Sequence, residues 1–145
     1  MKNILVIKHG SLGDIVQING ALKDLRSSFA DHNILLLTSP LYQELMIKCP
    51  YINDIILDDR KLKWNLLNFL KLRKKLNSYK FSHVFDLQNS KRTEIYRKCM
   101  SKNSIWSSSR TILRENEKKN EFDKLEILER FRIQLERSNI YPAHT

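Results

Sequence analysis

Residues 2–25 read KNILVIKHGSLGDIVQINGALKDL, and this stretch decides the fold. Ile4–Ile7 is a continuous run of apolar, strand-forming residues, which is typical of a strand covered on both faces. Gly10 and Gly13 follow, and after Asp14 the apolar residues recur at the three- and four-residue spacing of one helix face. The stretch therefore predicts a strand, a tight turn and a helix with an acid in its first turn. We expect the chemistry of the protein to lie at residues 10–14.

The glycine spacing of this turn differs from that of the two common nucleotide-binding loops. A dinucleotide fingerprint needs three glycines as G-x-G-x-x-G, and this turn has G-x-x-G followed by an acid. A P-loop needs Lys and Ser or Thr after its last glycine, where this chain has Asp14 and Ile15. A carboxylate there would repel a phosphate, but it could accept a proton or hydrogen-bond a sugar hydroxyl.

The remaining chain alternates between predicted strands and helices. We expect strands at 2–8, 33–38, 54–57, 82–87 and 104–107, and helices at 14–29, 40–48, 62–79, 91–100 and 122–138. This alternation favours an α/β, Rossmann-like fold, with a parallel sheet flanked by helices. Residues 110–120 are polar, and we expect a flexible loop there. Because ligands of such sheets bind at the carboxyl ends of the strands, residues 8–14 and 86–91 should lie on one rim, with Thr38 and Ser39 beside them.

Two motifs resemble a known family. KHGSLGD at 8–14, with NGAL at 19–22, resembles the amino-terminal motif of the ADP-heptose:lipopolysaccharide heptosyltransferases, glycosyltransferase family 9. FDLQNS at 85–90 resembles the family's Asp-Leu-Gln-Gly stretch, with Asn89 in place of the glycine; Asn also tolerates left-handed backbone angles. The family's enzymes have two domains in the GT-B arrangement. We therefore expect residues 1–145 to form one Rossmann-like acceptor-binding domain, without the carboxy-terminal nucleotide-sugar domain.

The resemblance implies transfer of a sugar from ADP-heptose to the lipopolysaccharide inner core, with inversion and without a metal or cofactor. Asp14 matches the family's proposed catalytic base, although it could instead only cap the helix. The implied acceptor is a phosphorylated lipid A carrying Kdo, and the implied location is the inner face of the cytoplasmic membrane. The residues that we expect to bind the acceptor are Lys8, His9, Gly10, Ser11, Gly13, Gln88, Asn89, Lys91 and Arg92.

The positive charge of the chain is concentrated in its middle third. Residues 61–102 hold twelve Lys and Arg against two acids, a net charge of +10, which equals the net charge of the whole chain. The predicted helix at 62–79 is surrounded by lysines, and we expect Leu62, Leu66, Phe69, Leu70 and Leu76 to form its core stripe, with further apolar residues off that stripe. This pattern fits shallow docking on an anionic membrane surface. The residues that we expect to touch the membrane are Lys63, Trp64, Leu67, Lys71 and Lys74. The same face could instead pack against a second domain or another chain, or be a solvated basic surface.

Other features of the chain separate the remaining classes of function. Asp58 and Asp59 are adjacent acids, which we interpret as a solvated turn rather than a metal site, and Cys49 and Cys99 lack zinc-finger spacing. We do not expect a nucleic-acid partner, because the aromatic residues are not arranged as a stacking platform and the acid-bearing turn would repel phosphate. The alternative to the acceptor-binding half of a transferase is a truncated, non-catalytic remnant or binding module.

Overall fold

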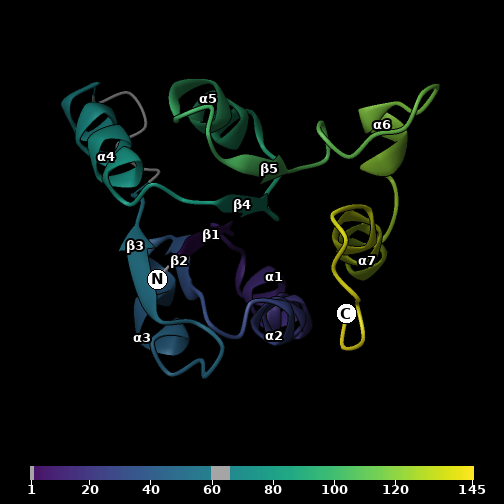
Figure 1. Ribbon diagram of the computed structural model, residues 1–145, viewed down its shortest axis with the longest axis horizontal. Helices are drawn as coiled ribbons and strands as arrows, with labels where there is room; N and C mark the ends of the chain where they lie inside the picture. Colours follow the sequence, from purple (N-terminus) through teal and green to yellow (C-terminus); the bar gives the residue numbers. More distant parts are fainter. Residues whose placement is uncertain (1, 60–65) are drawn as a thin grey trace.

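A single parallel sheet forms the centre of residues 2–59 and 66–145, which the computed structural model describes (Figure 1). Its strand order is β3-β2-β1-β4-β5, and β1 pairs in parallel with β2 on one side and β4 on the other. This arrangement confirms the predicted α/β, Rossmann-like fold. The strands are β1 (Asn3–Ile7), β2 (Asn33–Thr38), β3 (Asp54–Leu57), β4 (His83–Asp86) and β5 (Ile105–Ser107).

Helices cover both faces of the sheet, as Figure 1 shows. Ile4 and Val6 of β1 pack into one apolar cluster, and Leu5 and Ile7 pack into the other, so β1 is buried on both faces as expected. The first cluster contains residues from α1 (Leu12–Gln17), α2 (Asn19–Ser28), α3 (Gln43–Met46) and α7 (Ile127–Arg137). The second contains residues from α4 (Leu66–Ser78) and α5 (Lys91–Cys99). The short elements η1 (Pro40–Tyr42) and α6 (Lys119–Phe122) lie in the connections.

Three helices that were predicted as continuous are interrupted. The predicted helix at 14–29 begins earlier, at Leu12, and consists of α1 and α2 with a turn at Ile18. Asn and Gly at positions 19 and 20 are weak helix formers, and a Cβ on Gly20 would lie 2.1 Å from the carbonyl oxygen of His144. The predicted helix at 40–48 is η1 followed by α3. The predicted helix at 122–138 begins later, with α7 at Ile127, and its first residue, Phe122, is the end of α6.

The inner face of α4 also differs from the prediction. Phe69 and Leu72 pack against the second cluster and Leu76 is buried within it. Leu66 and Leu70, which we expected in the core, are 67% and 43% exposed. Leu70 follows Phe69 by one residue, about 100° round the helix, so it points outward when Phe69 packs inward. The expected core residue at position 62 lies outside the described residues.

Substitution by alanine at the two glycines of the first turn should affect stability in different ways. Gly10 has a φ of +126°, and a Cβ there would lie 2.2 Å from the ring of Tyr42. Gly13 lies in α1 with open space where its Cβ would be. We expect Gly10→Ala to lower the free energy of unfolding by about 1–3 kcal/mol through backbone strain. Gly13→Ala should be neutral or raise it by up to about 1 kcal/mol, since alanine favours a helix.

Urea unfolding of the two alanine variants measures both effects. Equal losses of stability in the two variants would contradict the assignment of strain to Gly10 alone.

Candidate functional site

The candidate site lies where the strand order reverses, between β1 and β4 (Figure 1). In open parallel sheets this switch point leaves a crevice at the carboxyl ends of the strands, where ligands bind. Lys8 Nζ donates to the carbonyl oxygen of Leu87 at 3.3 Å, and the backbone N–H of His9 donates to Gln88 Oε1 at 3.1 Å. The structure therefore brings the two predicted motifs together on one rim, although they lie about eighty residues apart in sequence.

Lys8 and Asp14 form an ion pair at this rim. Lys8 Nζ lies 3.6 Å from Asp14 Oδ2 and 5.6 Å from the centre of the Phe131 ring. The Lys8 side chain is only 4% exposed, whereas that of Asp14 is 35% exposed. Burial lowers the pKa of Lys8, and the charge of Asp14 acts in the opposite direction. The pair thus holds a carboxylate on the first turn of α1 while leaving it open to a ligand.

His9 is anchored on three sides and lies entirely within the protein. Its side chain Nε2 is hydrogen-bonded to Asp58 Oδ2 at 2.8 Å, and its carbonyl oxygen accepts from Ser39 Oγ at 2.8 Å. Together with the Gln88 contact, these bonds tie the end of β1 to the ends of β2, β3 and β4. The sequence indicated His9 as a rim residue, and the structure gives it contacts inside the fold.

Asp58 is the centre of a buried polar cluster, so the prediction of a solvated turn was wrong for this residue. It is 3% exposed, while Asp59 is exposed. Arg92 donates from Nε to Asp58 Oδ2 at 3.1 Å and from Nη2 to Oδ1 at 2.7 Å, and the Tyr96 hydroxyl donates to Oδ2. A buried carboxylate needs such donors, because burial removes the water that would otherwise solvate its charge.

The partners of Asp58 also shift the pKa values of the cluster. Burial alone would raise the pKa of Asp58, but hydrogen bonds from His9, Arg92 and Tyr96 hold it well below its ordinary value. The pKa of Tyr96 is raised by burial and by the neighbouring Asp58 carboxylate. The pKa of Arg92 is also raised: its burial acts to lower it, but Asp58 outweighs that effect. Asp58 and Arg92 are therefore both charged across the physiological pH range.

Asp86 is a second buried carboxylate, with a different environment. It is 2% exposed, and its Oδ1 accepts backbone N–H bonds from Gln88 at 3.1 Å and Asn89 at 2.8 Å. Burial raises the pKa of Asp86 to about 6, although the hydrogen bonds and Lys8 oppose the shift. The carboxyl group shapes the turn after β4 and lies beneath the rim.

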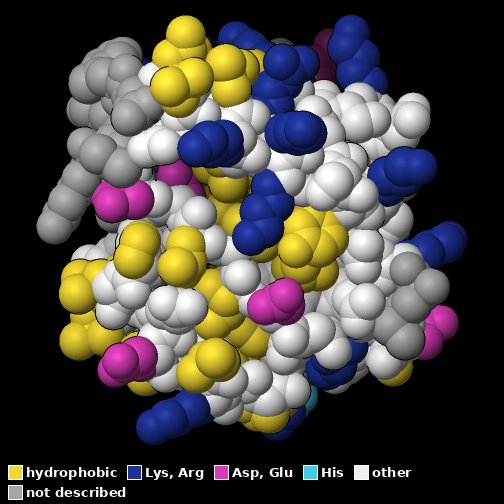
Figure 2. Space-filling model, turned by 90° about the vertical axis from the view of Figure 1, so that its left-hand side faces the viewer, with side chains coloured by type: hydrophobic (Ala, Val, Ile, Leu, Met, Phe, Trp, Pro, Cys, Tyr) yellow, Lys and Arg dark blue, Asp and Glu magenta, His cyan; other side chains and the backbone are white. Residues whose placement is uncertain are grey.

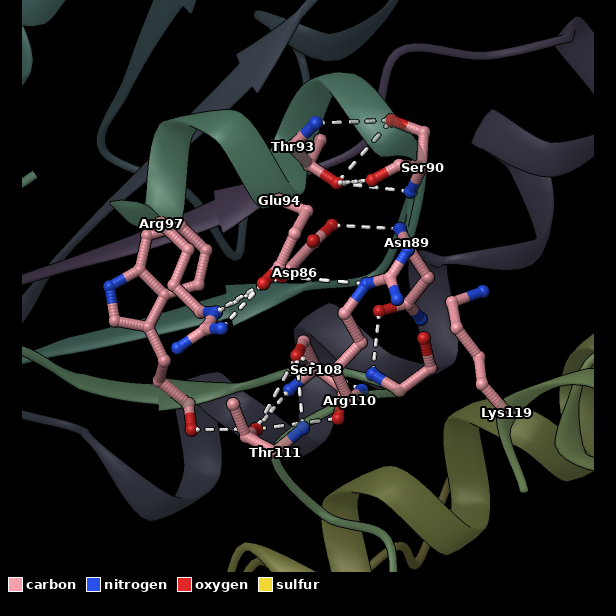
Figure 3. A network of polar contacts seen from close by, with 12 residues as sticks. Asp86, Asn89, Ser90, Thr93, Glu94, Arg97, Ser108, Arg110, Thr111 and Lys119 are labelled. Carbon is pink, nitrogen blue, oxygen red and sulfur yellow. Dashed lines mark hydrogen bonds and ion pairs between the residues drawn. The ribbon is translucent and has the colours of Figure 1, made fainter. Parts of the chain in front are cut away.

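Asn89 connects this turn to two further elements. Its φ is 54°, which confirms the left-handed conformation expected where the family has glycine. Its Oδ1 accepts from the backbone N–H of Ser109 at 2.8 Å, and its Nδ2 donates to Gln134 Oε1 at 3.1 Å. Figure 3 shows Asn89 between the turn that begins α5 and the turn at Ser108. Its side-chain amide is thus used within the fold, and contact with an acceptor stays a prediction.

The first turn of α5 is fixed by a capping box. Ser90 Oγ accepts from the Thr93 backbone N–H at 3.2 Å, and Thr93 Oγ1 accepts from the Ser90 N–H at 3.0 Å, as Figure 3 shows. Lys91 follows as the first helical residue and is exposed. The rim therefore presents one exposed cation here, beside an Arg92 side chain that is bound to Asp58.

The other predicted residues divide between the rim and α4. Ser11 and Gly13 are exposed at the start of α1, beside Asp14. Leu67, Lys71 and Lys74 are exposed on α4. Lys63 and Trp64 lie outside the described residues.

Three residues of the polar framework were not predicted: Asp58, Tyr96 and Gln134. Asp58 directly follows β3, so the rule that placed Lys8 on the rim would have included it. Tyr96 lies one helical turn after Arg92, a weaker signal. Gln134 is fully buried on α7 and donates to the carbonyl oxygens of Asp86 and Ser107, and nothing in the sequence indicated that contact.

Two further findings concern the described residues as a whole. None of the helices in residues 2–59 and 66–145 is long and apolar enough to span a bilayer. The same residues contain no group of three His, Cys, Asp or Glu side chains placed to hold a metal ion.

The chain is similar in fold to solved structures of glycosyltransferases. The chain is similar to the E. coli heptosyltransferase WaaC with ADP-2-deoxy-2-fluoro heptose, with a TM-score of 0.70 and 12% identity, over 99% of this chain and 50% of that one. It is similar to a glycosyl transferase of family 9 from Veillonella parvula DSM 2008, with a TM-score of 0.61 and 24% identity, over 68% of this chain and 29% of that one. For the E. coli ADP-heptose lps heptosyltransferase II, the TM-score is 0.53 and the identity 20%, over 68% and 28% of the two chains.

The chain has the fold found in these glycosyltransferases. It spans half or less of the length of each of them. No family model and no curated protein matches the sequence. The similarity in fold confirms the fold that the two motifs implied.

The raised pKa of Asp86 predicts an unusual pH dependence of stability. Its pKa in the folded protein, about 6, lies above the ordinary value of 3.8, so the folded state binds this proton more tightly than the unfolded chain does. The contribution of Asp86 to the free energy of unfolding is then largest below pH 3.8 and is lost as the pH rises through 6. Relative to Asp86→Asn, the wild-type protein should lose stability between pH 4 and pH 7.

Urea unfolding of both proteins at intervals across this range measures the difference. Two curves that stay parallel from pH 4 to pH 7 would show that Asp86 titrates at its ordinary value.

Proposed function

We propose that the protein is the acceptor-binding part of a heptosyltransferase-like glycosyltransferase, which transfers a sugar from ADP-heptose to the lipopolysaccharide inner core. The observation that carries this proposal is the Asp14 carboxylate, held by Lys8 at the switch point of a sheet with the heptosyltransferase fold. The two motifs that resemble the family, at 8–14 and 85–90, are the segments that form this rim. A carboxylate is the group that such a transfer needs on its acceptor side.

In the proposed reaction, Asp14 is the general base. The acceptor hydroxyl attacks the anomeric carbon of the donor, its proton passes to the Asp14 carboxylate, and ADP leaves from the opposite face with the electron pair of the broken bond. Lys8 pairs with Asp14 at 3.6 Å and keeps its carboxylate on the rim. Ser11, Gln88 and Lys91 would contact the acceptor, with Lys91 facing its phosphate groups. The mechanism assigns no step to a metal.

The donor would be bound by a second domain. The chain corresponds to half of the WaaC structure, whose bound molecule is an ADP-heptose analogue. We therefore expect residues 1–145 alone to release no ADP from ADP-heptose in the presence of a Kdo-lipid A acceptor. Robust turnover by this chain alone would contradict the division of roles between two domains.

Substitution of the proposed base tests the mechanism in a protein that contains both domains. We expect Asp14→Asn to lower the rate of transfer by about 10²–10⁴-fold, the usual contribution of a general base, while the thermal midpoint changes little. Asp31→Asn is the matched control, because Asp31 is an exposed carboxylate with no contact to the rim. The assay is ADP release from ADP-heptose, together with thermal unfolding of each variant. Retained activity in a destabilised Asp14→Asn protein would indicate a structural role only.

A non-catalytic binding module is the alternative function, because the polar rim could bind an acceptor without transferring a sugar to it. Measured affinity for the Kdo-lipid A acceptor, with no transfer in any longer form of the protein, would favour this alternative.

We also propose that the protein acts at the cytoplasmic face of the membrane, with α4 in contact with anionic lipid. Leu66 and Leu67 are 67% and 69% exposed at the start of α4, and Lys71 and Lys74 are exposed in its next turns. Figure 2, which faces the side of α4 and β3, shows apolar side chains beside Lys and Arg side chains. Exposed apolar groups beside lysines are the features by which a helix binds shallowly to an anionic surface.

Vesicle binding tests the role of α4. We expect the protein to bind vesicles of mixed anionic and neutral phospholipid, and the double variant Lys71→Glu/Lys74→Glu to bind at least about tenfold more weakly, since each lysine near such a surface contributes about 1 kcal/mol. Lys118→Glu/Lys124→Glu makes the same change of charge at exposed positions on either side of α6 and should bind as the wild type does. Equal weakening in both double variants would indicate a response to net charge rather than to α4.

A further inference from the structure

The burial of Asp58 draws three separate elements together. Its carboxylate, at the end of β3, accepts hydrogen bonds from Arg92 and Tyr96 of α5 and is bonded to His9 at the end of β1. A buried ion pair of this kind contributes little net stability, because desolvation offsets most of the attraction. Any other arrangement of these elements would leave a buried charge without partners.

His9 transmits this arrangement to the turn that follows it. Besides the bond to Asp58, its N–H is held by Gln88 and its carbonyl oxygen by Ser39. The next residue is Gly10, whose φ of +126° sets the direction in which the chain leaves β1. The chain then enters α1, and Asp14 in the first turn of this helix pairs with Lys8.

We propose that Asp58, His9, Arg92 and Tyr96 form a positioning network that fixes residues 10–14 and so aims the Asp14 carboxylate. Residues 10–14 are the turn after β1 together with the first residues of α1, and they are called the loop below. The four network residues, called the Asp58 network below, do not touch the reacting atoms. They act through the orientation of the loop. The catalytic meaning of this orientation rests on the proposed function of Asp14, but the mechanical coupling of the network to the loop does not.

The experiment is a measurement of backbone ¹⁵N order parameters for residues 10–14 in the wild type and in Asp58→Asn. We expect values near 0.85 in the wild type, typical of rigid backbone, and a fall to below about 0.6 in the variant. The amides of β1 and β4 should keep their values. Unchanged order parameters in residues 10–14 of Asp58→Asn, or a loop that is already mobile in the wild type, would overturn the proposal.

Asp24→Asn is the matched control. Asp24 lies on α2, away from the rim, and is also only 2% exposed. Its two carboxylate oxygens accept from the His144 N–H at 3.0 Å. Loss of its charge should destabilise the protein without reaching the loop. A loop loosened equally in Asp24→Asn would show that general destabilisation, and not the Asp58 network, controls it.

Milder variants keep the test decisive if Asp58→Asn does not fold. Tyr96→Phe removes one donor to Asp58 and keeps the ring, which packs in the core with Phe69. Arg92→Lys keeps the charge and removes the paired guanidinium bonds. Each of these two variants should lower the order parameters of residues 10–14, but by less than Asp58→Asn does. A loop that is unaffected in both variants would overturn the proposal.

Activity is a separate measurement, made in a protein that contains both domains. With the network disturbed by Tyr96→Phe or Arg92→Lys, we expect kcat to fall while the KM for the ADP-sugar is unchanged, since the base and not the donor site is misaligned. If the network variants have a loosened loop but the wild type itself shows no transferase activity, the network is supported and the proposed function is refuted. Transfer that persists with a rigid loop in every network variant would refute the network alone.

Discussion

The position of β1, paired on both sides and buried on both faces, is the constraint on which the site depends. It carries Lys8 and His9 to the rim at 3% and 0% exposure, where neither polar side chain can be solvated by bulk water. Each must therefore find partners in the protein. Those partners come from the ends of β3 and β4 and from α1, so the need to satisfy two buried side chains assembles the rim.

Two buried carboxylates show how the environment, rather than burial alone, sets the charge at this rim. Asp58 and Asp86 are 3% and 2% exposed, yet the pKa of Asp58 is lowered and that of Asp86 is raised to about 6. Asp58 accepts from a guanidinium, an imidazole and a phenol, whereas Asp86 accepts mainly from backbone and hydroxyl groups. A charged partner offsets desolvation, and neutral dipoles do so only in part. The two residues consequently respond to pH in opposite directions.

The sequence predicted what periodicity and strand order control, and it could not predict contacts between distant elements. The apolar run of β1 and the glycine turn indicated the sheet, the rim and the proximity of the two motifs. Asp58 was misread because an adjacent pair of acids is usually solvated, and only the approach of Arg92 and His9 makes its burial possible. The close approach of the His144 carbonyl oxygen to Gly20 joins residues 124 positions apart and leaves no local pattern.

Asn89 shows how a departure from a family motif follows from the structure. A glycine could adopt the left-handed backbone at this position without cost, and asparagine adopts it at a small one. The asparagine side chain adds two hydrogen bonds, to the Ser109 N–H and to Gln134. Gln134 in turn binds the carbonyl oxygens of Asp86 and Ser107, at the ends of β4 and β5. Asparagine thus links α7 to the rim at a position where glycine would provide only the turn, and these contacts stabilise the rim opposite the Asp58 network.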